Sequence, residues 1–425
     1  MPPVKPSLLL TTESSKERLS IRGRSRWKII SRCREGARRV YYGSGFKANK
    51  EIPPKMTLNR ATWRTEWFLA VSLATCLAFA VAGKSLQSAL ANPLVLAFVF
   101  LWLFAAILGS AMSVVRQAEH IAVLLGEPYG TLVLTLSVTF IEVMSISAVM
   151  LHGENNPTLV RDTLMAVIMI ILNGMVGLSL LVGAWKHREQ HYNLQGANAY
   201  LGVIIPLAVL ALVLPNCTVT TAGPTLSHPQ EWTLALLTIS LYAVFLAVQT
   251  GRHRGYFRVS DMDAIEEHKV ASSGPRSLPY HVALLTLYIL PVIYLAEQLA
   301  YPVDYVTETL HAPQALSGVV IALLVATPEA IGAVRAALAN QMQRSVNIFL
   351  GSVLSTIGLT IPAMLAVSNL TGHPIVLGVE HANLLLLLLT LGLSILTFAS
   401  GRTNVLQGVV HLLLFVTFLL LLVQG

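Results

Sequence analysis

Long apolar stretches restrict this chain more than any other feature of its sequence. A helix needs about 20 apolar residues to cross a bilayer, and eleven stretches of about this length occur. Hydrophobic residues make up 54% of the chain and charged residues only 12%, which is unlike an ordinary soluble domain. The sequence therefore predicts an all-α membrane protein with about eleven transmembrane helices. The predicted spans are residues 63–83, 93–115, 128–151, 161–184, 197–214, 231–250, 278–298, 313–336, 344–368, 376–398 and 403–423.

The spans form one leading helix and two groups of five. Residues 56–92 hold the leading helix, 93–250 and 278–425 hold five spans each, and the charged loop 251–277 separates them. Because each half has an odd number of spans, the two halves have opposite orientations. Inverted repeats of this kind are a common transporter plan, with the substrate bound near the midplane between them.

Two intramembrane acids support the duplication. Glu142 lies in the second span of the first half and Glu329 in the second span of the second half, 187 positions later. Asp162 and Asn347 open the spans that follow, 185 positions apart. A nearly constant offset over two spans indicates a repeated unit.

The basic residues indicate how the chain is oriented. If the N-terminus is cytoplasmic, the outer loops hold only Lys84 and Arg161 as basic residues. That asymmetry follows the positive-inside rule and predicts a cytoplasmic N-terminus. The inner loops would then hold Arg116, Lys186, Arg188, Arg252, Arg254, Arg258, Lys269, Arg276, Arg335, Arg344 and Arg402.

Residues 1–55 form a basic extension with fourteen Lys and Arg against four Glu. This segment accounts for the net charge of +8, since the rest of the chain is slightly acidic. The charge is thus local, and nucleic acid is not a predicted partner. The extension is predicted to be disordered or peripheral. Three interpretations remain open: a cytoplasmic tail, an Arg-rich targeting peptide, or sequence upstream of a true start at Met56.

The stretch from Ala326 to Gly332 places a carboxylate, Glu329, inside an apolar run. An ionised, unpaired acid there is costly, so such a residue usually faces a cavity, an ion or a partner. Pro328 lacks an N–H group, so a carbonyl near Leu324 loses its helical partner and becomes a potential ligand. We expect Glu329 and Glu142 to form one site.

Polar residues around the two acids complete an all-oxygen set of candidate ligands. Such a set suits Ca²⁺, which takes six to eight oxygen ligands, whereas zinc and copper prefer the nitrogen and sulfur ligands absent here. Burial and a nearby like charge both favour a protonated carboxyl group. A site that holds either a cation or protons couples the movements of the two. Secondary candidate ligands are Thr139, Asn173, Thr327, Pro328, Ser352, Ser355 and Thr356.

Plainer interpretations exist for each feature. A membrane glutamate can join helices through hydrogen bonds while protonated, and a proline can simply kink a helix. Hydroxyl and amide side chains often serve as packing contacts between membrane helices. His411 lies near a span end and is interpreted as interfacial.

Four stretches resemble the bacterial calcium/proton antiporters of the ChaA type, within the cation/calcium exchanger superfamily. They begin at Gly126 (Gly-Glu-Pro-Tyr-Gly-Thr), Ala326 (Ala-Thr-Pro-Glu), Asn347 (Asn-Ile-Phe-Leu-Gly-Ser-Val-Leu-Ser-Thr) and Gly401 (Gly-Arg-Thr-Asn-Val-Leu-Gln-Gly). The resemblance covers about residues 60–425. It implies an eleven-span antiporter in a bacterial inner membrane, with Glu142 and Glu329 as the paired acids.

The leading hypothesis is a secondary antiporter that exports Ca²⁺ in exchange for H⁺, and the alternative is Na⁺(K⁺)/H⁺ exchange through the same site. No protease motif or nucleotide-binding loop occurs in the sequence, which argues against an enzyme or an ATP-driven pump. Neither a cofactor nor a metal other than the transported cation is expected. Membrane lipid and inorganic cations are the expected partners, and assembly into a homo-oligomer is left open.

Overall fold

The computed structural model describes residues 60–126, 129–152, 156–221, 223–258 and 277–424. Among these residues the regular elements are all helical, and eleven helices are long and apolar enough to cross a membrane. The predicted fold class is thereby confirmed. The basic segment 1–55, Met56 and the acidic residues of the 251–277 loop lie outside the described residues, so the interpretations of them stay predictions.

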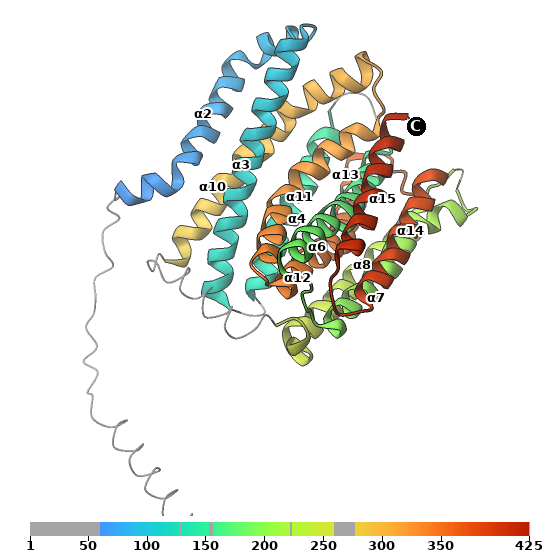
Figure 1. Ribbon diagram of the computed structural model, residues 1–425. Coiled ribbons are helices and arrows are strands. Elements are labelled where there is room, and N and C mark those ends of the chain that lie inside the picture. The colour runs from blue at the N-terminus through green and yellow to red at the C-terminus, as the bar shows by residue number, and fades with distance from the viewer. Residues whose placement is uncertain (1–59, 127–128, 153–155, 222, 259–276, 425) are drawn as a thin grey trace, which may run out of the picture. The chain divides into compact units, whose positions relative to one another are not determined.

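Figure 1 shows the helices as one bundle, in which α2, α3 and α10 lie together at one edge. Several spans are composites of α-helix and a short π-helical segment. The main elements are α2 (Arg60–Ser88), α3 (Pro93–Leu125), α4 (Tyr129–Met150), α5 (Leu159–Ile168), η1 (Met169–Met175), α6 (Val176–His187), α7 (Leu194–Leu212), α8 (His228–Ala247), α10 (Leu278–Asp304), α11 (Ala315–Leu338), α12 (Met342–Ser355), η6 (Thr356–Thr360), α13 (Ile361–Thr371), α14 (His381–Phe398) and α15 (Val405–Gln424). Shorter segments are η2 (Leu214–Cys217), η3 (Val248–Arg252), η4 (Arg254–Tyr256) and η5 (Tyr305–Thr309).

Each predicted span coincides with an observed helix, but several helices extend further. Arg116, Arg335 and Arg344, assigned to loops from the sequence, lie within α3, α11 and α12. The seventh span, expected to end near 298, continues to Thr309. The apolar windows miss these extensions because a helix that leaves the hydrocarbon region can carry charged residues without a desolvation cost.

Two composite helices form the centre of the bundle. In the spans Leu159–His187 and Met342–Thr371, 78% of the most apolar window is buried, against 17% for α15 and 22% for α2. Leucines on the peripheral helices are instead exposed, such as Leu101 on α3 at 63% and Leu396 on α14 at 73%. An apolar face of this kind is suited to contact with lipid chains.

Glycines let the central helices pack closely against their neighbours. A Cβ atom on Gly318 of α11 would lie 2.6 Å from the backbone nitrogen of Thr163 on α5. On Gly408 of α15 it would lie 2.6 Å from the nitrogen of Leu181 on α6. Small residues permit such backbone contact in membrane helices, where packing rather than hydrophobicity drives association.

Each central helix contains a π-helical turn at an equivalent place. The turn η1 begins at Met169 and η6 begins at Thr356, a separation of 187 residues. The same interval separates Glu142 from Glu329. The matching interval supports the interpretation of two repeats, which stays a prediction.

The leading helix α2 is fixed to its neighbours through a partly buried acid, Glu66, whose side chain is 13% exposed. The Glu66 carboxylate accepts hydrogen bonds from Arg116 at 2.9 Å and Gln117 at 3.1 Å on α3, and from the Tyr288 hydroxyl at 2.8 Å on α10. Ser72 of α2 and Ser110 of α3 also pair at 2.7 Å. These contacts join α2, α3 and α10.

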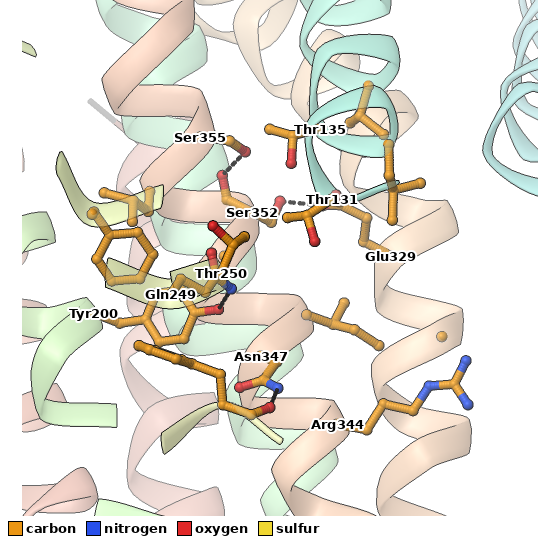
Figure 2. A pocket seen from close by; sticks show the side chains of 18 of the residues that line it. Thr131, Thr135, Tyr200, Gln249, Thr250, Glu329, Arg344, Asn347, Ser352 and Ser355 are labelled. Atoms are coloured by element: carbon orange, nitrogen blue, oxygen red, sulfur yellow. Dashed lines mark hydrogen bonds between the residues drawn. The ribbon is translucent and has the colours of Figure 1, made fainter. Parts of the chain in front are cut away.

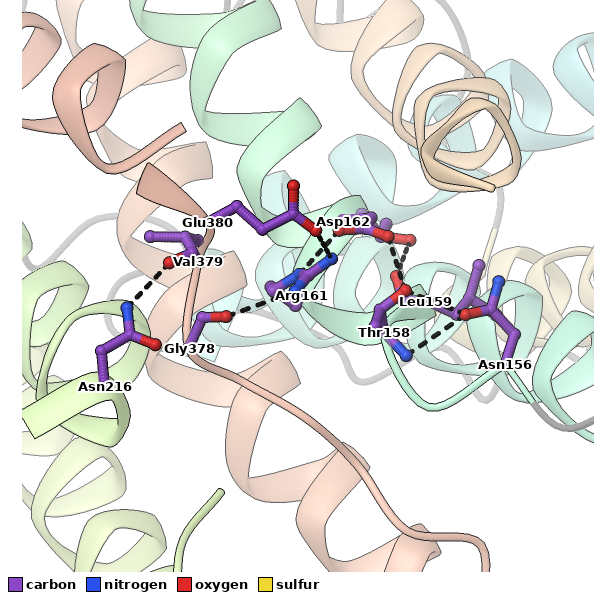
Figure 3. Close-up of polar contacts among 10 residues, drawn as sticks. Asn156, Thr158, Leu159, Arg161, Asp162, Asn216, Gly378, Val379 and Glu380 are labelled. Carbon is purple, nitrogen blue, oxygen red and sulfur yellow. Dashed lines mark hydrogen bonds and ion pairs between the residues drawn. The ribbon is translucent and has the colours of Figure 1, made fainter. Parts of the chain in front are cut away.

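A buried ion pair fixes the beginning of α5 (Figure 3). The Arg161 Nε donates to Asp162 Oδ1 at 2.8 Å, and these side chains are only 8% and 5% exposed. The guanidinium group also contacts Glu380 at 3.3 Å and the Gly378 carbonyl at 3.4 Å, while the Thr158 hydroxyl donates to Asp162 at 2.8 Å. The assignment of Arg161 to a loop is wrong, because it lies in the first turn of α5 and its charge is paired inside the fold.

We expect Arg161→Met to destabilise the protein, because it leaves the Asp162 carboxylate buried without its cation. Breaking a buried pair in this way costs about 3–5 kcal/mol, so the unfolding temperature in detergent should fall clearly. The matched control is Arg402→Met, which removes a 3.9 Å pair with Glu189 in which both side chains are more than half exposed. Exposed pairs contribute about 1 kcal/mol or less. Equal unfolding temperatures for the two variants would contradict this role of Arg161.

Candidate functional site

Glu142 is a buried acid held by two hydroxyl groups. It lies on α4 and is 1% exposed. Its Oε2 atom accepts hydrogen bonds from Thr356 at 3.0 Å and from Thr360 at 2.9 Å, both in η6. Its Oε1 atom is buried and has no partner within the part of the chain that the structure describes. One oxygen of this carboxylate is thus engaged and the other is available.

Glu329 lies on α11 and is partly buried. The Ser352 hydroxyl of α12 donates to its Oε2 atom. The helix runs unbroken through Pro328, although this residue cannot donate to the carbonyl of Leu324. The preceding Thr327 hydroxyl bonds to the Leu323 carbonyl. The carboxylate therefore projects from a continuous helix whose hydrogen-bond pattern is locally altered.

The two acids meet on one face of the same central helix. Ser352, which bonds to Glu329, and Thr356, which bonds to Glu142, are four residues apart. Residues at this spacing lie one above the other on a helix, about one turn apart. The two carboxylates are also close enough to interact electrostatically. Two acids from different spans thus form one cluster.

A cavity of about 470 Å³ leads to this cluster (Figure 2). It begins beside Arg344 in the first turn of α12 and continues along that helix past Asn347 to Ser352 and Ser355. Glu329 lines it, whereas Glu142 does not. The two acids therefore differ in access: Glu329 faces the cavity and Glu142 lies behind the hydroxyl groups of α12 and η6.

The structure separates the other candidate ligands into two groups. Ser352, Ser355 and Pro328 line the cavity, and Ser355 donates to the Ser352 carbonyl at 2.9 Å. Thr139 is 7% exposed and lies one turn before Glu142, but like Thr327 it does not line the cavity.

Asn173 belongs to a different polar cluster, so the structure does not support it as a ligand beside the acids. Its Nδ2 donates to Thr390 at 2.8 Å, and its Oδ1 lies 3.2 Å from Nδ1 of His411. Nε2 of His411 lies 2.9 Å from the Thr397 hydroxyl, and the Tyr192 hydroxyl donates to the Thr397 carbonyl at 3.1 Å. Burial raises the pKa of Tyr192 to about 12, so this donor keeps its proton. His411 is fully buried, and its interpretation as interfacial is wrong.

Sequence reasoning missed Thr360 as a partner of Glu142. It lies four residues after Thr356 and eight after Ser352, so continuing the hydroxyl stripe would have found it. A π-helical turn changes which residues share a face, and such turns are frequent at functional sites. The sequence does not show where a helix changes from α to π geometry.

The cluster supplies only oxygen atoms to a cation. Among the described residues, no group of three or more His, Cys, Asp or Glu side chains is placed to hold a metal ion. A cation here would be held by two carboxylates with the hydroxyls of Ser352, Thr356 and Thr360. Such ligands suit hard cations. A proton can replace the cation on either carboxylate.

Comparison with curated proteins finds similar transporters in bacteria. The ionic transporter y4hA of Sinorhizobium fredii is 45% identical over 320 residues, which is 74% of this chain and 85% of that protein. The sodium-potassium/proton antiporter ChaA of Escherichia coli is 40% identical over 317 residues, 74% of this chain and 86% of that protein.

A solved structure shares the fold. The structure of native YfkE superposes with a TM-score of 0.65, at 20% identity, over 84% of this chain and 100% of that one. The profile of the family described as sodium/calcium exchanger protein matches residues 95–251 and 280–424, which include both acids and most of the bundle. The chain belongs to the sodium/calcium exchanger protein family.

Proposed function

We propose that this multi-pass membrane protein is a secondary antiporter that exports Ca²⁺ in exchange for H⁺, with Glu142 and Glu329 as the shared cation and proton site. The proposal rests mainly on one observation, that both acids accept hydrogen bonds from the same central helix. Glu329 bonds to Ser352 and Glu142 bonds to Thr356, one turn further on. Two acids held one turn apart on the same helix are better explained as a cation site than as two separate contacts between helices.

Exchange follows from the chemistry of the cluster. Two carboxylates in an apolar interior cannot both stay ionised without a counter-charge, because desolvation and mutual repulsion both oppose it. Either a bound cation or bound protons remove that cost. Loading a cation thus expels protons, and protonation expels the cation. No separate energy source at the site is required.

The cavity supports access from the cytoplasm in this conformation. Three basic residues, Arg254, Arg258 and Arg344, line it, and the first two are exposed. All three belong to the basic residues that the sequence assigns to the inner side. By the positive-inside rule that side is cytoplasmic. The protein would then face inward, in a bacterial inner membrane with a cytoplasmic N-terminus. Glu329 is the acid that a cytoplasmic cation meets first.

A specific observation favours a second candidate, Na⁺(K⁺)/H⁺ exchange. The 40% identical relative from Escherichia coli is named a sodium-potassium/proton antiporter. The Bacillus subtilis protein named Ca(2+)/H(+) antiporter ChaA is 24% identical over 219 residues. We retain Ca²⁺ as the leading substrate because the cluster offers two carboxylates and several neutral oxygens, as calcium sites do.

We expect Glu142→Gln and Glu329→Gln each to abolish exchange while leaving membrane insertion intact. Glutamine keeps the size of the side chain but cannot carry the charge that binds a cation. The measurement is cation-induced proton release from acid-loaded everted vesicles, with insertion checked by membrane fractionation. The matched control is Glu297→Gln, an exposed acid on α10, which should retain normal exchange. Undiminished exchange in either site variant would refute the proposed site.

The same vesicles distinguish the two substrates. We expect Ca²⁺ to release protons at lower concentrations than Na⁺ or K⁺, because two carboxylates attract a divalent ion more strongly than a monovalent one. Dose-response curves for CaCl₂, NaCl and KCl at one ionic strength supply the comparison. Proton release by Na⁺ or K⁺ without a response to Ca²⁺ would contradict the calcium assignment and establish the second candidate.

A further inference from the structure

Ser145 carries a buried hydroxyl group that has no hydrogen-bond partner in the described part of the chain. It lies on α4, one turn after Glu142, and is 4% exposed. Its Oγ atom has no hydrogen-bond partner among the described residues, and neither has Oε1 of Glu142. Residues three apart on a helix share a face. Two unsatisfied oxygen atoms thus occur on the same face of α4, next to the candidate site.

The missing contact is unusual for this protein. Several buried helical hydroxyls elsewhere bond to the carbonyl four residues earlier, as Ser137 does to Val133 at 2.7 Å and Ser110 does to Ala106 at 2.8 Å. The Ser145 hydroxyl makes no such bond to Ile141. Buried polar groups are seldom left unpaired in native proteins, so each exception calls for an explanation. Ser179 also has no partner among the residues that the structure describes, but it lies on α6 and not on the helix of either acid.

We propose that Glu142 Oε1 and Ser145 Oγ form an inner subsite for the transported inorganic cation, separate from the Glu329–Ser352 contact that faces the cavity. The inference rests on the proposed exchange function and adds a ligand to it. A dehydrated cation between the two oxygens satisfies both, since a carboxylate and a hydroxyl each offer lone pairs. Thr356 and Thr360 hold Oε2 of the same carboxylate, which leaves Oε1 for the ion.

The two subsites imply an order of loading. A cation from the cavity meets Glu329 and Ser352 first, because these residues line it. Glu142 and Ser145 lie behind them and outside the cavity lining. Transfer to the inner subsite removes the ion from the cavity, which is the occlusion step that exchange between two sides of a membrane requires. Ser145 thus affects cation affinity, whereas the proton is carried by the acids.

The test is cation-dependent thermal stabilisation of the purified full-length protein in detergent, titrated with CaCl₂ and with NaCl. A ligand that binds only the folded state stabilises it by RT ln(1 + [L]/Kd), so the unfolding temperature rises with the logarithm of the cation concentration above Kd. The Kd fitted from this dependence is the half-saturating concentration of the cation. We expect Ser145→Ala to raise the half-saturating concentration of the preferred cation about tenfold or more, as for loss of a contact to a charged group. Ser137→Ala is the matched control, because it removes a buried hydroxyl from the same helix, and it should leave that concentration unchanged.

A second variant guards against a packing effect. Ser145→Cys keeps nearly the same size but replaces a hard oxygen with sulfur, a poor ligand for hard cations, so it should weaken cation binding as Ser145→Ala does. An unchanged half-saturating concentration in both Ser145 variants, with stabilisation lost in Glu142→Gln, would refute the subsite and leave the proposed exchange intact. A lower unfolding temperature without a change in that concentration would show a structural hydroxyl only. Cation stabilisation that persists in Glu142→Gln and Glu329→Gln would overturn the proposed site itself.

Discussion

The hydrogen bonds from one central helix to two carboxylates are the contacts on which this site depends. Ser352 holds Glu329 of α11, and Thr356 with Thr360 holds Glu142 of α4. Each acid would be costly alone in an apolar bundle. Together, and held by neutral hydroxyl groups, they can be neutralised by a cation or by protons. The rest of the bundle places these three helices against one another.

The two acids are not equivalent, although their positions in the chain correspond. Glu329 faces the cavity and has one hydroxyl partner, whereas Glu142 is buried and has two. The first-half positions 187 residues before Ser352 and Thr356 are Met165 and Met169. The hydroxyl groups that hold both acids therefore come from the second half alone. The two halves can therefore be repeats of one unit and still contribute different numbers of ligands to the site.

Much of the fold could be predicted from the sequence because it follows from local composition. Apolar windows found all eleven spans, and the cost of an intramembrane charge selected Glu142 and Glu329. Contacts between distant segments could not be read in this way. The amide side chain of Asn173 made it a candidate ligand, yet it contacts His411 and Thr390. The charge of Arg161 suggested a loop position, yet it pairs with Asp162 inside the fold.

In the proposed exchange, cation and protons occupy the same two carboxylates in turn. It is tested most directly by titrating the purified protein with cation in a calorimeter, at one pH, in two buffers of different ionisation enthalpy. We expect different apparent heats in the two buffers, because cation binding releases protons to the buffer. This difference should vanish when Glu142 and Glu329 are both replaced by Gln. Cation binding by the unaltered protein with the same heat in both buffers would show that no protons are displaced and that the two carboxylates are not shared.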